Sequence, residues 1–112
     1  MIEESIKLTK LACGDLIISK VLSDSMVYIV EDPLQIMYVP GQHGMRQILM
    51  PWIEGSATRV FDIAPHTIIT KTDPQREVID AYMNVVNARR FSDLEEELVP
   101  PSIKQNINNN MH

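Results

Sequence analysis

The fold is decided by residues 5–23, which read SIKLTKLACGDLIISKVLS. Two strand-like runs, residues 5–11 and 16–22, flank the short segment ACGD. Gly14 and Asp15 supply the turn, because glycine adopts the positive φ that a three-residue hairpin with a bulge requires. The stretch therefore predicts a β-hairpin, and the later strands are expected to lie against it.

The second of these runs indicates strong curvature. Residues 16–18 (LII) are apolar on both faces, whereas residues 19–22 (SKVL) alternate more clearly. Burial of both faces at one end and of one face at the other is typical of a strand that curls through a small barrel.

The rest of the first 71 residues predicts further strands, for a total of five or six. Pro33 cannot donate a hydrogen bond to a sheet, so it marks a bend or bulge. We expect either one long bent strand at this point or two strands that meet at a corner. Outside the hairpin, the expected strands cover residues 26–30, 34–39, 46–53, 59–63 and 67–71.

A helix is predicted after these strands. Asp73 is a suitable N-cap, and Pro74 suits the first turn of a helix. From residue 75 to about residue 88 the apolar positions form a stripe, and we expect Ile79, Tyr82 and Val86 to be buried. Residues 91–99 predict a short second helix, which is acidic. The expected division is a domain over residues 1–90 and an acidic, then asparagine-rich tail over residues 91–112.

Composition sets the class of protein. The chain has 112 residues, a net charge of −5 at pH 7 and one cysteine, Cys13. A single cysteine excludes an internal disulfide and favours a reducing, cytoplasmic location in a bacterium or an infected cell. No signal peptide is expected at the N-terminus, and the apolar runs are too short for a membrane span. The negative charge disfavours broad binding to nucleic-acid phosphates but leaves room for a small local RNA site.

No motif for catalysis, a metal or a cofactor is visible, so a non-enzymatic protein is predicted. The three histidines, His43, His66 and His112, are not at ligand spacing from one another. Cys13 has no neighbouring histidine in sequence that would activate its thiol. The best polar binding surface is the loop with Gln42, His43 and Arg46, and its alternative interpretation is an ordinary solvated loop.

Four stretches together resemble the Sm-like (Lsm/Hfq-type) family, and most closely the small Sm-like proteins of marine tailed phages and marine metagenomes. They are IKLTKLACGDLIISKV (residues 6–21), YIVEDPLQI (28–36), LMPWI (49–53) and DPQREVIDAY (73–82). The resemblance implies a small, strongly bent, five-stranded antiparallel Sm-like (SH3-like) barrel with a C-terminal helix. It also implies assembly edge to edge into a homo-oligomeric ring.

The family generally binds RNA through loops that face the pore of the ring. The resemblance therefore points to Asp24 and Ser25 as ligand contacts, beside Gln42, His43 and Arg46. The chain departs from the family pattern at two motifs, because no asparagine follows Asp24-Ser25-Met26 and no Arg-Gly pair precedes the last strand. The helix is also C-terminal here, whereas Sm proteins usually carry one at the N-terminus.

The sequence thus predicts a ring protein that binds single-stranded RNA. The alternative is a phage or bacterial protein-binding adaptor, a structural ring without affinity for nucleic acid.

Overall fold

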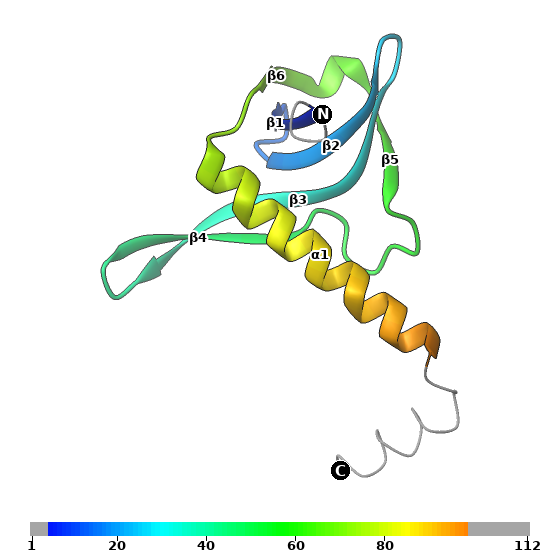
Figure 1. Cartoon of the computed structure of the whole chain (residues 1–112). Coiled ribbons are helices and arrows are strands. Elements are labelled where there is room, and N and C mark those ends of the chain that lie inside the picture. The colour runs from blue at the N-terminus through cyan, green and yellow to red at the C-terminus, as the bar shows by residue number, and fades with distance from the viewer. Residues whose placement is uncertain (1–4, 99–112) are drawn as a thin grey trace. The chain divides into compact units, whose positions relative to one another are not determined.

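The computed structural model describes residues 5–98, with side chains described up to residue 92. An antiparallel sheet of six strands precedes one long helix (Figure 1). The predicted mostly-β class with a C-terminal helix is confirmed. In chain order the elements are β1 (Ile6–Leu11), β2 (Leu16–Asp24), β3 (Tyr28–Gly41), β4 (Gly44–Pro51), β5 (Val60–Ile63), the 3-10 turn η2 (Pro65–Thr67), β6 (Ile68–Thr72) and α1 (Arg76–Leu98).

The strand order across the sheet is β4-β3-β2-β1-β6, and β5 also pairs with β3. β4 pairs with residues 34–41 of β3, and β5 pairs with residues 28–31, so the two share one side of β3 (Figure 1). The loop over residues 52–59 separates them, and the total of six strands lies within the predicted five or six. The five-stranded barrel that the resemblance implies has one strand fewer. Within residues 5–98 no pairing joins β6 to β4 or β5, so the sheet is open and has two edges.

The β1–β2 turn has the predicted geometry. The amide of Gly14 donates to the carbonyl of Leu11 at 2.9 Å, and the amide of Leu11 donates to the carbonyl of Asp15 at 2.9 Å. Gly14 has a φ of 105°, the positive value that favours glycine. The Asp15 carboxylate then accepts from the side chains of Gln35 (3.1 Å) and Trp52 (3.2 Å). These bonds tie the turn to β3 and to the residue that follows β4.

β3 is one continuous strand with a sharp bend at Asp32, the first of the two predicted alternatives. Asp32 is 3% exposed and has a φ of 51°, and the β2–β3 register shifts at the same place. Two neighbours hold the bend. The amide of Asp32 donates to the carbonyl of Arg59 at 2.8 Å. The hydroxyl of Tyr82 in α1 donates to the carbonyls of Asp32 (3.0 Å) and Glu31 (3.2 Å).

A core cluster combines apolar side chains from β1, β2, β3 and β5. Trp52 and Phe61 meet edge to face at its margin, with ring centroids 6.0 Å apart. Burying each large aliphatic or aromatic side chain stabilises the fold by roughly 1.5–3 kcal/mol before entropy is counted. The buried members are Leu11, Ile17, Tyr28, Val30 and Ile63, and the half-buried ones around them are Val21, Trp52, Phe61 and Ile68.

Most strand ends differ from the predicted ranges by one or two residues, and two of these differences move a turn. β2 continues to Asp24, so the turn to β3 occupies residues 25–27 instead of 23–25. β4 begins at Gly44, two residues before the predicted start, because Gly41 pairs directly with Gly44 across a two-residue turn. β6 begins at Ile68, one residue after the predicted start, because Pro65–Thr67 form η2.

The helix also differs from its prediction. α1 runs without a break from Arg76 to Leu98, so the prediction of a separate short helix is wrong. The carbonyl of Gln75 accepts the amide of Ile79 at 3.1 Å, which places the helix start two residues later than an N-cap at Asp73 requires. The Asp73 carboxylate instead forms an ion pair with Lys7 of β1.

The expected buried face of the helix is confirmed, because Ile79, Tyr82 and Val86 are 9%, 2% and 5% exposed. The chain divides into two compact units, Met1–Tyr82 and Met83–His112, and the division falls inside α1. The predicted boundary after residue 90 also falls inside α1. Residues 99–112, which include the asparagine-rich tail, lie outside the described residues.

Candidate functional site

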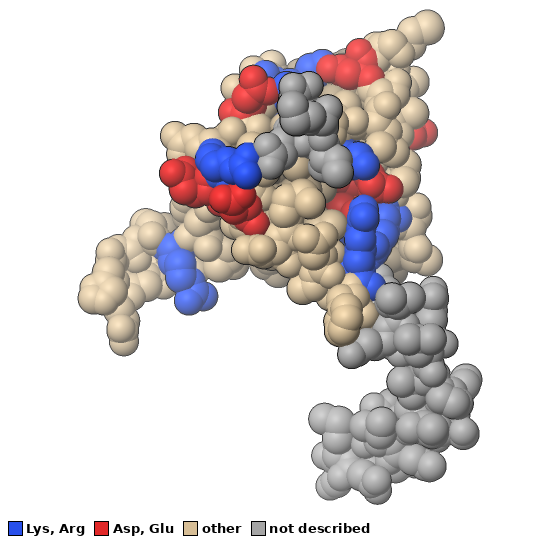
Figure 2. All heavy atoms as spheres, viewed as in Figure 1, with Lys and Arg blue, Asp and Glu red and all other residues tan. Residues whose placement is uncertain are grey.

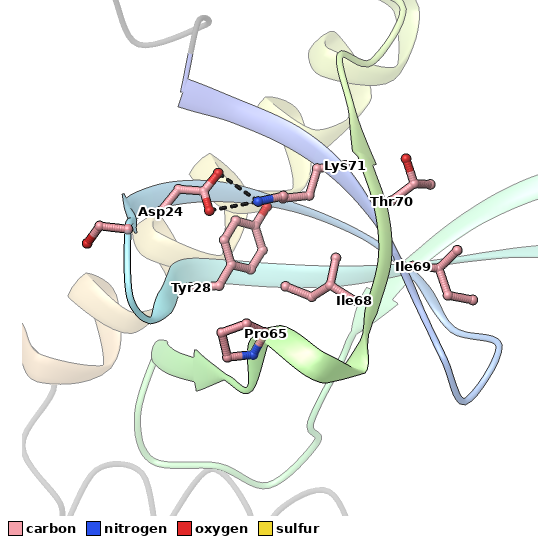
Figure 3. A pocket seen from close by; sticks show the side chains of 8 residues that line it. Asp24, Tyr28, Pro65, Ile68, Ile69, Thr70 and Lys71 are labelled. Atoms are coloured by element: carbon pink, nitrogen blue, oxygen red, sulfur yellow. Dashed lines mark hydrogen bonds and ion pairs between the residues drawn. The ribbon is translucent and has the colours of Figure 1, made fainter.

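A pocket of about 260 Å³ opens where the end of β2, the start of β3 and β6 come together (Figure 3). Asp24, the last residue of β2, is the register partner of Tyr28, the first residue of β3. β6 lies beyond β1 in the sheet order, so only the curvature of the sheet brings it back to this place. The lining residues are Asp24, Ser25, Tyr28, Pro65, Ile68, Ile69, Thr70 and Lys71.

An ion pair spans the mouth of the pocket. The ammonium of Lys71 in β6 donates to both carboxylate oxygens of Asp24, at 2.8 and 3.0 Å (Figure 3). The side chains of Asp24 and Lys71 are 47% and 37% exposed. Water screens such a pair, so it contributes only about 0.2–1 kcal/mol to stability. Both groups are therefore accessible to a ligand at little cost to the fold.

Tyr28 forms the buried wall of the pocket and is 1% exposed. Its hydroxyl shares a 2.7 Å hydrogen bond with the hydroxyl of Thr9 in β1. The Lys71 ammonium lies 5.1 Å from the centroid of the Tyr28 ring, within cation–π distance. Burial raises the pKa of the Tyr28 hydroxyl above its ordinary value, although the bond to Thr9 opposes this. The tyrosine thus stays neutral and positions the lysine.

A second ion pair lies beside the first. Lys7 of β1 is bonded to Asp73, and this hydrogen bond raises the pKa of the lysine. The Asp24 carboxylate and the Tyr28 hydroxyl act on the Lys7 charge in the same direction. The charges of Asp24, Lys71 and Lys7 thus all act on Tyr28, and within the lining of the pocket one carboxylate balances one ammonium.

The apolar part of the pocket comes from η2 and β6. The side chain of Ile68 extends toward Tyr28 and Pro65, whereas that of Ile69 extends away from them (Figure 3). Ile69 is 64% exposed. The pocket therefore combines one apolar wall with a charged rim, the usual composition of a small binding site.

The structure separates the residues that were predicted as ligand contacts. Asp24 and Ser25 line the pocket together. Gln42 and His43 form the turn between β3 and β4, and Arg46 lies on β4. This turn follows the far end of β3, so these three residues do not join Asp24, and all three are exposed.

The sequence did not single out Tyr28, Thr9 and Lys71 as site residues. Thr9 lies within a strand and is 0% exposed, so its buried hydroxyl needs a partner. The contact between Thr9 and Tyr28 could be predicted only if the register of β1, β2 and β3 were already known. Lys71 belongs to no motif in the sequence, and the fold alone brings it to Asp24.

Other reactive side chains are dispersed. Cys13 is exposed in the β1–β2 turn, and His43 and His66 are exposed in separate turns. Among the described residues, no three His, Cys, Asp or Glu side chains lie together in a way that would hold a metal ion. His112 lies outside those residues. In the same part of the chain, no helix is both long enough and apolar enough to cross a membrane.

Surface charge is mixed rather than gathered by sign. On the face that Figure 2 shows, Lys and Arg groups alternate with Asp and Glu groups. This face therefore lacks the continuous basic surface that binding to phosphates along a strand requires.

Comparison with models of protein families finds no match to the chain, and no curated protein matches it. The open sheet edges and the Asp24–Lys71 pocket therefore provide the basis for a functional proposal.

Proposed function

We propose that this protein is a non-enzymatic subunit of an Sm-like homo-oligomeric ring that binds single-stranded RNA at the Asp24–Lys71 pocket. The observation that supports the ring is the pair of open sheet edges, β6 on one side and β4 with β5 on the other. An unpaired edge offers a row of amide and carbonyl groups to another chain. When one edge of each copy pairs with the other, different edge of the next copy, the contact is head to tail. Such contacts generate a closed ring if the rotations between successive copies add up to a full turn.

Exposed apolar side chains on both edges support the same proposal. Ile69 of β6 is 64% exposed, Met45 of β4 is 66% exposed and Val60 of β5 is 41% exposed. Solvent-exposed edge strands are usually protected by charges, and these positions carry none. Pairing of β6 with the β4–β5 side of the next copy would cover them.

The curvature of the sheet supports an Sm-like barrel. β2 and β6 are not neighbours in the sheet, yet Asp24 and Lys71 are in contact across it. The β2–β3 turn and the η2–β6 segment therefore meet at one pocket, and in a ring this pocket would be a place for RNA. Both features agree with what the resemblance implies for loops that face a pore.

The alternative function, a protein-binding adaptor ring without affinity for nucleic acid, is favoured by the net charge of −5 and by the alternating charges in Figure 2. Both functions share the ring and differ only in the ligand. In either case we place the protein in a phage or its bacterial host.

Native mass measurement of the purified full chain tests the ring. We expect a multiple of the 12.8 kDa subunit at micromolar concentration. Ile69→Lys should reduce the mass to that of a monomer, because it places a charge on an edge strand. Phe91→Lys makes a similar change at a side chain that is 63% exposed on α1, and it should leave the mass unchanged. A wild-type monomer would reject the proposal.

Titration with labelled oligo-U and oligo-A at several salt concentrations tests the RNA ligand. Binding at micromolar concentration or tighter, weakened by salt, is expected. An oligomer that binds neither of these RNAs nor a guanine-containing oligonucleotide at low salt would favour the adaptor.

A further inference from the structure

We infer that the Asp24–Lys71 pocket recognises the Watson–Crick edge of a guanine base. This inference rests on the proposed binding of RNA and names the base that the pocket would select. It follows from the size of the pocket, from its apolar wall and from the arrangement of donors and acceptors at its rim.

The size of the pocket limits the ligand to about one base. Sites for drug-sized molecules usually have volumes of roughly 300–1,000 Å³. At about 260 Å³ this pocket is smaller, and one wall consists of the apolar side chains of Ile68 and Pro65 (Figure 3). A flat heterocycle buries its faces against such a wall and leaves its polar edge for the rim. Single-stranded RNA presents its bases in this way, because unpaired bases can turn out of the strand.

The rim offers two acceptors next to one donor. A carboxylate has acceptors only, and an ammonium has donors only. The two Asp24 oxygens lie 2.8 and 3.0 Å from the Lys71 nitrogen, so all three groups are within reach of one base edge. The Watson–Crick edge of guanine has two adjacent N–H donors followed by one carbonyl acceptor. The carboxylate would accept both N–H groups, and the ammonium would donate to the carbonyl.

No other standard base satisfies all three groups. Uracil has one N–H between two carbonyls, so one oxygen of Asp24 would face a carbonyl. Adenine and cytosine each have one amino group beside ring acceptors, so the carboxylate would again have only one partner. Both Asp24 oxygens already accept from Lys71, so only a base with two adjacent N–H donors replaces both bonds when it binds, and this difference is the source of selectivity.

The buried polar group of the pocket does not compete for the base. The Tyr28 hydroxyl is already bonded to Thr9 in the buried part of the pocket. The Asp24–Lys71 pair is partly exposed, so its exchange for bonds to a base requires little reorganisation. The charge-assisted bonds to the base would be shorter and stronger than bonds between neutral groups.

The test is a calorimetric titration of the full chain with the four nucleoside monophosphates. We expect guanosine monophosphate to bind about ten-fold or more tightly than the other three, as for one well-placed pair of base contacts. Asp24→Asn replaces one acceptor with a donor at nearly constant shape and should abolish this preference. Asp62→Asn is the matched control, because Asp62 is an exposed acid on β5 that does not line the pocket.

Short uridine oligonucleotides that carry a single G, A or C separate this inference from the proposed function. If the wild-type ring binds all of them equally, the guanine inference is overturned while RNA binding stands. If it binds no oligonucleotide at low salt, both are overturned. Preference for the G-containing strand that Asp24→Asn removes and Asp62→Asn retains would support both. The wild-type comparison alone decides the question if a variant does not fold.

Discussion

Removing the hydroxyl of Tyr82 should destabilise the sheet unit by loosening the bend of β3. This hydroxyl donates to the carbonyls of Asp32 and Glu31, and the tyrosine is 2% exposed. A buried hydrogen bond contributes about 0.5–1.5 kcal/mol, and a buried carbonyl that loses a donor adds a further penalty of about 1 kcal/mol or more. We therefore expect Tyr82→Phe to lower the free energy of unfolding by about 1–2 kcal/mol.

Urea denaturation followed by circular dichroism measures this change, with Tyr38→Phe as the matched control. Tyr38 is 58% exposed, so the same substitution there should change stability by less than about 0.5 kcal/mol. For a unit of this size, a loss of 1–2 kcal/mol lowers the Tm by about 5 °C or more. Equal unfolding midpoints for the two variants would show that the hydroxyl does not hold the bend.

Three further predictions concern the turn, the pocket and the helix. Gly14→Val should lower the free energy of unfolding by about 1–3 kcal/mol through backbone strain at the positive φ alone, since an added Cβ meets no atom within 4 Å. Gly14→Asn should lower it clearly less in the same urea assay. Equal stabilities of the two variants would refute the strain. Burial raises the pKa of the Tyr28 hydroxyl above 10.0, so the neutral tyrosine contributes fully to stability below pH 10, and this contribution is lost as pH rises through the raised pKa. Between about pH 9 and pH 11 the urea midpoint of unfolding should therefore fall less for Tyr28→Phe than for wild type. An equal fall of the midpoint for both proteins would contradict this. Ile79→Glu should cost about 3 kcal/mol or more by burying a charge, whereas Gln75→Glu on the exposed side should change the Tm little; similar Tm values would reject the helix face.

Local signals in the sequence predicted the hairpin, the bend and the helix face. Gly14 marks its turn because few residues other than glycine adopt a positive φ, and Pro33 marks the bend because it lacks an amide donor. Ile79 and Tyr82 follow a helical period that tertiary packing preserved. Such features depend on residues close in the sequence, which is why a single chain reveals them.

The helix start was not predictable in this way. Asp73 has the side chain of an N-cap, but its carboxylate forms an ion pair with Lys7 of β1 instead. This outcome depends on a partner that is distant in sequence.

The pocket itself was not predictable from the sequence. The family resemblance pointed to Asp24 and Ser25 as ligand contacts, which stays a prediction, and both residues line the pocket. Lys71 reaches Asp24 only because the sheet curves. This curvature results from the twist between neighbouring strands, which accumulates across the sheet. The charge pair at the rim is therefore a property of the fold and not of any short motif.

The pairing of β6 with β1 has a consequence for how the sheet assembles. β1, β2, β3 and β4 are joined in succession by short turns, so each pair closes a small loop of chain. β6 instead joins β1 from the opposite end of the sheet unit, at a much larger cost in loop-closure entropy. We therefore expect β6 to dock late in folding and to exchange its amide hydrogens before the central strands do. A strand that detaches first is also the strand that two copies of the chain can most readily exchange by domain swapping.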